Sequence, residues 1–248
     1  YSLVTQTDGK ILIAGYTTAQ PAGNTGTSNN YGVVRLNANG TLDTTFGSSG
    51  TALLDLGAGT GDSAYSVVTQ TDGKILIAGV TKAQPSGSTG TSTNYGIARL
   101  NADGSLDTSF GELVGSSRTG KALLDLGADT TDIAYSLVTQ TDGKILIAGN
   151  TTAQPAGNTG TSTNYGVVRL NANGTLDTTF GSSGKALLDL GANTSDYAYS
   201  LVTQTDGKIL IAGYTTAQPA GNTGTSNNYG VVRLNANGTL DTTFGSSG

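Results

Sequence analysis

The acidic side chains are the first candidates for chemistry, because the chain contains no Cys and no His. Imidazole bases, Ser-His-Asp triads and tetrahedral zinc sites are therefore excluded. A glycosidase would need two carboxylates in different environments. Asp62, Asp132 and Asp196 instead recur in near-identical Asp-x-Ala-Tyr-Ser segments. The sequence favours a loop-capping role for these three residues and predicts that the protein is not an enzyme.

A second group of oxygen-bearing side chains surrounds Gly104. Asn101, Asp103 and Asp107 are spaced like the ligands of a calcium loop, which supplies six to eight hard oxygens near a sharp glycine turn. The equivalent segments of the other repeats carry only one Asp each. Because Asn-Gly and Asp-Gly pairs are also ordinary turn formers, the sequence predicts a turn here. A weak calcium site at these three residues is the alternative, and no other cofactor is expected.

Arginines recur at fixed spacing on one predicted strand, and aspartates recur on another. The sequence favours cross-strand Arg–Asp ion pairs, which would satisfy both charges. A ring of guanidinium groups that attracts anions into a central channel is the alternative. The arginines are Arg35, Arg99, Arg169 and Arg233, and the expected partners are Asp55, Asp125 and Asp189.

Tyrosines also recur once or more in each repeat. We expect their rings to pack in the core and their hydroxyl groups to stay in water. A platform that stacks against sugar rings is the alternative. The residues are Tyr1, Tyr31, Tyr65, Tyr95, Tyr135, Tyr165, Tyr199 and Tyr229.

An internal repeat must position all these side chains. The string Thr-Asp-Gly-Lys-Ile-Leu-Ile-Ala-Gly begins at Thr7, Thr71, Thr141 and Thr205, and residues 1–50 are identical to residues 199–248. This self-similarity predicts a tandem array. We divide the chain into repeats 1–64, 65–134, 135–198 and 199–248, with a six-residue loop insertion near 112–117 in the second repeat. The fourth repeat lacks its last strand, and we expect the chain to belong to a longer array.

Each repeat is predicted to form four short strands. In the first repeat these are Tyr1–Gln6, Ile11–Gly15, Tyr31–Asn37 and Ala52–Leu56. Asp8-Gly9 predicts a two-residue hairpin with a type I′ turn. No segment has helical periodicity. The fold class is therefore all-β, with tandem four-stranded antiparallel blades in a β-propeller or propeller-like array. A β-solenoid or fibre of stacked meanders is the alternative.

Composition excludes several classes of partner. The chain has 12 basic and 17 acidic residues and a formal net charge of -5, so it lacks the basic surface of a nucleic-acid binder. It also lacks an apolar run long enough to insert in a membrane.

Two motifs in fixed order carry a family resemblance. Residues 8–15 (Asp-Gly-Lys-Ile-Leu-Ile-Ala-Gly) and 33–47 (Val-Val-Arg-Leu-Asn-Ala-Asn-Gly-Thr-Leu-Asp-Thr-Thr-Phe-Gly) resemble the bacterial delta-60 repeat family, and residues 98–111 of the second repeat resemble it still more closely. The resemblance implies a propeller-like repeat in large exported or surface-associated bacterial proteins, without an established activity.

These observations together predict a structural or adhesive repeat protein of the bacterial cell surface or extracellular matrix. We expect its partners to be other copies of itself, joined head to tail into fibres through open strand edges. The alternative is a lectin-like, glycan-binding propeller with one site in each blade.

Overall fold

The computed structural model of the chain describes residues 1–245 and 248. Over these residues the regular secondary structure consists entirely of β-strands, and no helix that could span a membrane is present among them. The chain forms two compact units. The first contains residues Tyr1–Asp125 and Asn173–Thr175, and the second contains Leu126–Ala172 and Leu176–Gly248.

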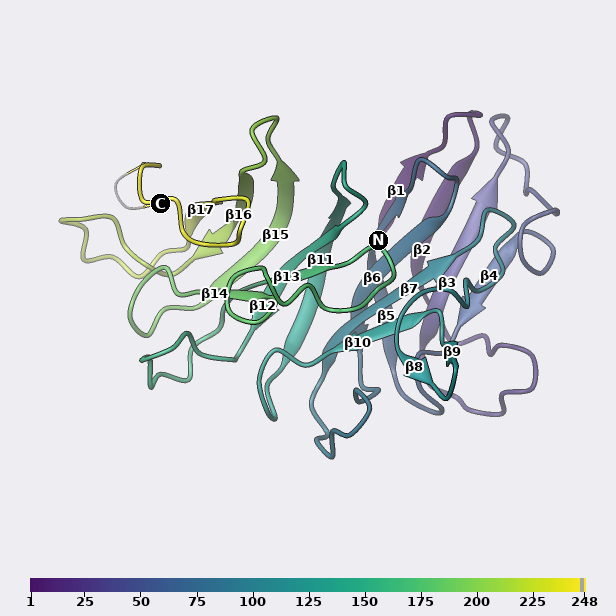
Figure 1. Ribbon diagram of the computed structural model, residues 1–248, viewed down its shortest axis with the longest axis horizontal. Coiled ribbons are helices and arrows are strands. Elements are labelled where there is room, and N and C mark those ends of the chain that lie inside the picture. The colour runs from purple at the N-terminus through teal and green to yellow at the C-terminus, as the bar shows by residue number, and fades with distance from the viewer. Residues whose placement is uncertain (246–247) are drawn as a thin grey trace. The chain divides into compact units, whose positions relative to one another are not determined.

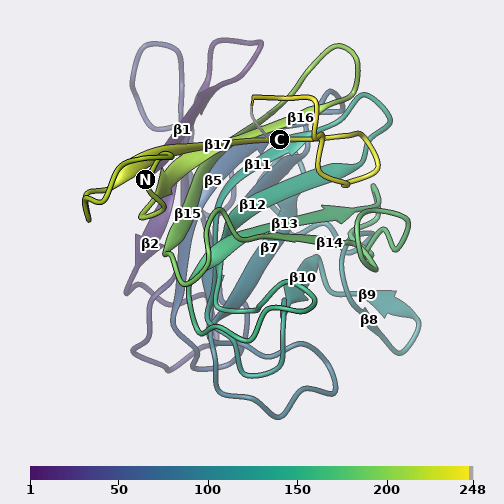
Figure 2. The ribbon, with the colours of Figure 1, turned by 90° about the vertical axis from the view of Figure 1, so that its left-hand side faces the viewer.

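The first unit contains two four-stranded antiparallel sheets, which we number blades 1 and 2 (Figure 1). Blade 1 has the order β1 (Ser2–Thr5), β2 (Ile11–Thr17), β3 (Asn30–Leu36) and β4 (Thr51–Leu54). Blade 2 has the order β5 (Asp62–Thr69), β6 (Ile75–Thr81), β7 (Asn94–Leu100) and β10 (Lys121–Leu124). The insertion in the second repeat forms a separate small hairpin of β8 (Leu113–Val114) and β9 (Ser117–Arg118), which is visible in Figure 2.

The second unit contains blades 3 and 4. Blade 3 has the order β11 (Asp132–Thr139), β12 (Ile145–Thr151), β13 (Asn164–Leu170) and β14 (Lys185–Leu188). Blade 4, within the described residues, is a three-stranded sheet of β15 (Asp196–Thr203), β16 (Ile209–Thr215) and β17 (Asn228–Leu234). The predicted all-β fold of four-stranded antiparallel sheets is confirmed.

The apolar second strand is covered to different degrees in different blades, and in blade 1 its Ile13 is 36% exposed. Ile75, Leu76, Ile77 and Ala78 are all fully buried, as expected for a strand that is covered on both faces. Each unit has its own apolar core, which joins the facing sides of its two blades.

The hairpin at Asp8-Gly9 differs from the prediction. A type I′ turn needs positive φ at both central residues, but only Gly9 has one, at +82°. Thr5 pairs with Ile11, and the Gly9 N–H donates to the carbonyl oxygen of Gln6 at 3.0 Å. The loop is therefore longer than two residues and consists of a type I turn followed by a left-handed glycine. The predicted turn type was wrong because the loop length, rather than the Asp-Gly pair, selects the turn.

A β-bulge interrupts the first strand of blades 2, 3 and 4. In blade 2, Ala64 pairs with Gly79 and Ser66 pairs with Ala78, so Tyr65 is an extra residue without a position in the ladder. The same shift occurs at Tyr135 and Tyr199. Since bulges redirect a side chain, each of these strands presents a tyrosine at the point where its ladder is broken.

Candidate functional site

Each blade has an arginine on its third strand that pairs with an aspartate on the following loop. The Nε–Oδ2 distances lie between 2.6 and 2.7 Å. The pairs are Arg35–Asp43, Arg99–Asp107, Arg169–Asp177 and Arg233–Asp241.

The predicted ion pairing is thus correct in kind, but the predicted partners were wrong. The Asp43 N–H donates to the carbonyl oxygen of Arg35 at 2.9 Å, so the two residues lie opposite each other. Asp55 follows β4, whose Leu54 pairs with Tyr31, and it therefore lies beyond the start of β3 and away from Arg35. The carboxylate of Asp55 instead accepts a hydrogen bond from the Asn24 side chain of the long polar loop.

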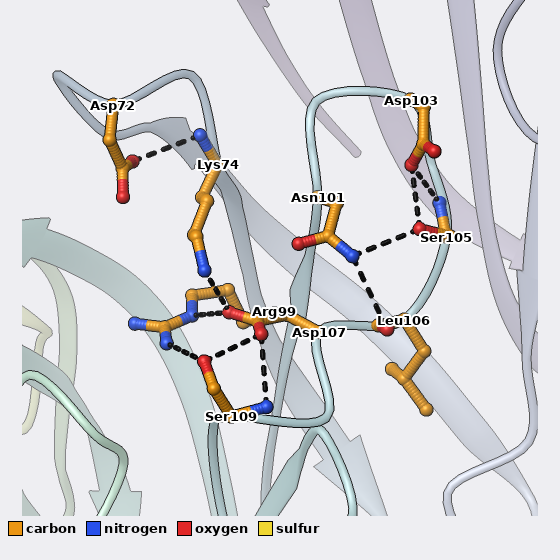
Figure 3. Close-up of polar contacts among 9 residues, drawn as sticks. All are labelled: Asp72, Lys74, Arg99, Asn101, Asp103, Ser105, Leu106, Asp107 and Ser109. Atoms are coloured by element: carbon orange, nitrogen blue, oxygen red, sulfur yellow. Dashed lines mark hydrogen bonds and ion pairs between the residues drawn. The ribbon is translucent and has the colours of Figure 1, made fainter.

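A lysine completes each cluster, as Figure 3 shows for blade 2. Lys74 Nζ lies 2.7 Å from Asp107 Oδ2, the oxygen that Arg99 also contacts. Ser109 donates to the other carboxylate oxygen through its N–H at 3.0 Å and its hydroxyl at 2.7 Å. The Arg99 guanidinium also lies 4.5 Å from the centre of the Phe110 ring. The cluster therefore fastens the loop to the strands through ion pairs, hydrogen bonds and a cation–π contact. We call this cluster of Lys, Arg, Asp and Phe in each blade the clip.

Sequence reasoning missed the lysine and the phenylalanine of this cluster. In every repeat, both residues lie at the same number of positions along the sequence from the arginine, and this constant spacing is the signal that could have found them. Burial also argues against the alternative in which the guanidinium groups surround a central channel and attract anions. Three of the arginines are almost fully buried: Arg35, Arg99 and Arg169 are 6%, 7% and 7% exposed.

The cluster holds its aspartates in the charged form. Burial alone would raise the pKa of Asp107, but hydrogen bonds from Lys74, Ser109 and Arg99 outweigh it and lower the pKa well below its ordinary range. The pKa values of Asp43, Asp177 and Asp241 are lowered in the same direction.

The three calcium candidates do not share one site. Asp103 Oδ1 accepts hydrogen bonds from the N–H and hydroxyl of Ser105, and the Asn101 side chain donates to the Ser105 hydroxyl at 2.9 Å. Figure 3 shows Asp103 at the far end of this turn from Asp107, which is bound to its own two cations. Over residues 1–245 and 248, no group of three or more acidic side chains is placed to hold a metal ion. Calcium binding at Asn101, Asp103 and Asp107 stays a prediction, in which a metal would compete with Lys74 and Arg99.

Asp62 occupies a buried position between two blades of the first unit. Its carboxylate accepts hydrogen bonds from the Leu56 N–H at 2.7 Å and from the Thr81 hydroxyl at 2.5 Å. This geometry agrees with the loop-capping interpretation, because the carboxylate ties the end of one repeat to the next. Burial raises the pKa of Asp62 to about 6. Burial likewise raises the pKa of Asp196 in the second unit.

The third-strand tyrosines have two kinds of environment. Tyr31 and Tyr165 are fully buried, and their hydroxyl groups donate to the carbonyl oxygens of Gly96 at 2.9 Å and Gly230 at 3.0 Å. The expectation that these hydroxyls stay in water was wrong, because the next blade covers the whole side chain. Tyr229 on β17 is 96% exposed.

The bulge tyrosines take part in aromatic clusters in both units. Tyr135 and Tyr199 lie 5.1 Å apart between ring centres, and Tyr199 is 47% exposed. Tyr197 and Tyr214 extend this group, with their rings stacked 4.8 Å apart. Sequence reasoning missed both, since neither position is a tyrosine in every repeat. In the first unit Tyr1 and Tyr65 make a similar contact at 5.3 Å.

Comparison with protein families decides the family. A family model described as a domain of unknown function (DUF5122) beta-propeller matches residues 6–46, 70–110, 140–180 and 204–244. The chain belongs to this family. Each DUF5122 match contains the Lys, Arg, Asp and Phe of one cluster, so the matched segment is the part of the repeat that builds the clip. The predicted β-propeller class is confirmed, and the delta-60 resemblance is compatible with DUF5122. No curated protein matches the chain.

One group of aspartates has lowered pKa values and Asp62 has a raised pKa, and together they predict that the protein is most stable in mildly acidic solution. The clip aspartates contribute stability that is present above the unfolded pKa of about 3.9 and is lost as the pH falls through their lowered folded pKa values. Asp62 contributes stability that is fully present below about pH 3.9 and is lost as the pH rises through about 6. The melting temperature should therefore be highest near pH 4 to 5. Calorimetry across this range checks the prediction, and Asp62→Asn should flatten the decline above the optimum. A melting temperature that keeps rising toward pH 8 would contradict it.

Proposed function

We propose that the chain is a non-enzymatic structural or adhesive protein of the bacterial surface or extracellular matrix, whose partners are other copies of itself. The observation that carries this proposal is that the recurring charged side chains bind partners within their own blade and in the neighbouring blade. Asp107 is engaged by two cations, and Arg35 reaches across the blade boundary to donate to the carbonyl oxygen of Ala102 at 2.5 Å. These groups stabilise the blades and their contacts, which is the requirement of a mechanical scaffold.

Assembly of the purified chain tests the proposed role. We expect particles that lengthen with concentration in electron micrographs and in a light-scattering dilution series. The route proposed from the sequence is pairing along open strand edges, such as the outer edge of β17. Compact monomers at every concentration would remove the assembly part. Fractionation of bacteria that carry the gene tests the location, and a purely cytosolic protein would overturn the surface role.

A second candidate function is glycan binding, which the aromatic cluster around Tyr199 favours. Tyr199 is 47% exposed, next to Tyr135, and offers aromatic surface of the kind that packs against the apolar side of a sugar ring. Binding to a glycan array, with and without calcium, should be lost in Tyr199→Ala and kept in Tyr165→Phe, whose ring is buried elsewhere. Silence of the wild-type chain across the array would contradict this function.

A further inference from the structure

The same hydrogen bonds join neighbouring blades in both units. In the first unit Tyr31 donates to the carbonyl oxygen of Gly96, Arg35 to that of Ala102, and the Gly47 N–H to that of Asp103 at 2.7 Å. In the second unit the equivalent bonds are Tyr165 to Gly230, Arg169 to Ala236 at 2.6 Å, and Gly181 to Asn237 at 2.7 Å. A blade of this protein therefore has a donor face, which carries the Tyr, Arg and Gly donors, and an acceptor face, which carries the three carbonyl groups.

Blade 4 exposes its donor face. Tyr229 is 96% exposed, whereas the equivalent Tyr31 and Tyr165 are fully buried. Val231 is 49% exposed, whereas the equivalent Val33 is fully buried.

Blade 1 exposes its acceptor face. Leu3 is 61% exposed and Ile13 is 36% exposed. Their equivalents in blade 4 are Leu201 at 2% and Ile211 at 0%, because blade 3 covers them. Each unit thus carries an apolar sheet face whose counterpart elsewhere in the chain is covered by another blade.

We propose that the donor face of blade 4 binds the acceptor face of blade 1 in a second copy of the chain. The contact consists of three hydrogen bonds around an apolar centre that contains Val231 and Leu3. The bonds run from Tyr229 Oη to the carbonyl oxygen of Gly32, from Arg233 Nη1 to that of Ala38, and from the Gly245 N–H to that of Asn39. This inference rests on the proposed self-association and specifies its interface.

Sequence identity makes a second copy the matching occupant. Residues 1–50 and 199–248 are identical, so the donor face of blade 4 has the strand sequence with which blade 1 binds blade 2. The acceptor face of blade 1 likewise has the sequence with which blade 4 binds blade 3. Both halves of the interface therefore already form this contact within one chain, with the same donors and acceptors.

The proposed interface joins two different surfaces, so it is heterologous and continues from copy to copy until it closes on itself. It also differs from edge pairing, because it uses side chains on the sheet faces rather than unpaired backbone along β17.

Sedimentation velocity of the full chain in a dilution series tests the interface. Tyr229→Asp, which places a charge on the donor face, should leave the chain monomeric, and so should Leu3→Asp on the acceptor face. Mixing these two variants should restore a dimer and nothing larger, because each retains the face that the other has lost. Tyr229→Phe removes one hydrogen bond and should raise the dissociation constant about tenfold. Leu113→Ser, which changes an exposed apolar residue on β8, should assemble like the wild-type chain.

The outcomes separate this inference from the proposed function. Wild-type assembly that Tyr229→Asp and Leu3→Asp leave intact would overturn the face-to-face interface and keep a self-associating scaffold that uses strand edges. A mixture of the two variants that stays monomeric would also overturn the interface. A wild-type chain that is monomeric throughout the series would overturn self-association itself.

Discussion

Replacing Asp107 with Ala is expected to lower the free energy of unfolding of the first unit by about 3 kcal/mol. Asp107 is 4% exposed, and its carboxylate binds both Lys74 and Arg99. Lys74 can turn toward water, since its side chain is 27% exposed, but the Arg99 side chain is only 9% exposed and would lose its ion pair in a buried position. The hydrogen bonds to Ser109, which hold the loop, would be lost as well. Urea unfolding followed by circular dichroism measures the change.

Asp103→Ala is the matched control for this substitution. Asp103 lies on the same loop, but its carboxylate is exposed and binds only Ser105, so the free energy of unfolding should fall much less than in Asp107→Ala. If the two variants were equally stable, the buried ion pairs would not be the source of loop stability. Added salt should change the effect of Asp107→Ala little, because buried pairs are weakly screened.

Replacing Gly79 with Ala is expected to destabilise blade 2 by about 3 kcal/mol or more. Gly79 lies opposite the bulge, where a Cβ would come within 2.0 Å of the Ser63 carbonyl oxygen and 2.8 Å of the Ala64 Cα. Both obstacles are backbone atoms, so no side chain can move aside. The bulge must open or its partner strand must shift, and the Tyr65 side chain would lose its position. Thermal unfolding and the tyrosine circular dichroism signal measure the two effects.

Gly61→Ala provides the control, because Gly61 directly precedes β5, the strand that pairs with the strand of Gly79. A Cβ at Gly61 meets no atom within 4 Å, so its substitution should change the stability by no more than about 0.5 kcal/mol. A Gly79 variant as stable as the Gly61 variant would show that the bulge does not require glycine.

Much of the fold could be predicted because its signals are local. The apolar run Ile11–Gly15 predicted a strand, which the structure forms as β2, and the recurrence of its motif predicted the repeated blades. The turn type at Asp8-Gly9 was missed, because the pairing of Thr5 with Ile11 sets the loop length. The bulge at Tyr65 was missed for the same reason, since a bulge is a property of two paired strands.

The candidate site was predicted only in part. Four recurring arginines indicated ion pairs. Whether Arg35 pairs with Asp43 or Asp55 depends on the register of the paired strands, however, and the spacing of residues along the chain does not reveal that register. The calcium candidates were grouped because they are close in sequence, whereas the folded turn directs Asp103 and Asp107 to different partners.

The sequence by itself determined the repeat, the strands and the residue types that exclude His- and Cys-based chemistry, because all of these depend on neighbours along the chain. Only the tertiary structure decided which copies of a residue are covered. Tyr31 and Tyr229 occupy identical sequences, and one is fully buried while the other is 96% exposed. The difference arises because burial depends on the neighbouring blade in space: blade 2 covers Tyr31, whereas no blade of the described residues covers Tyr229.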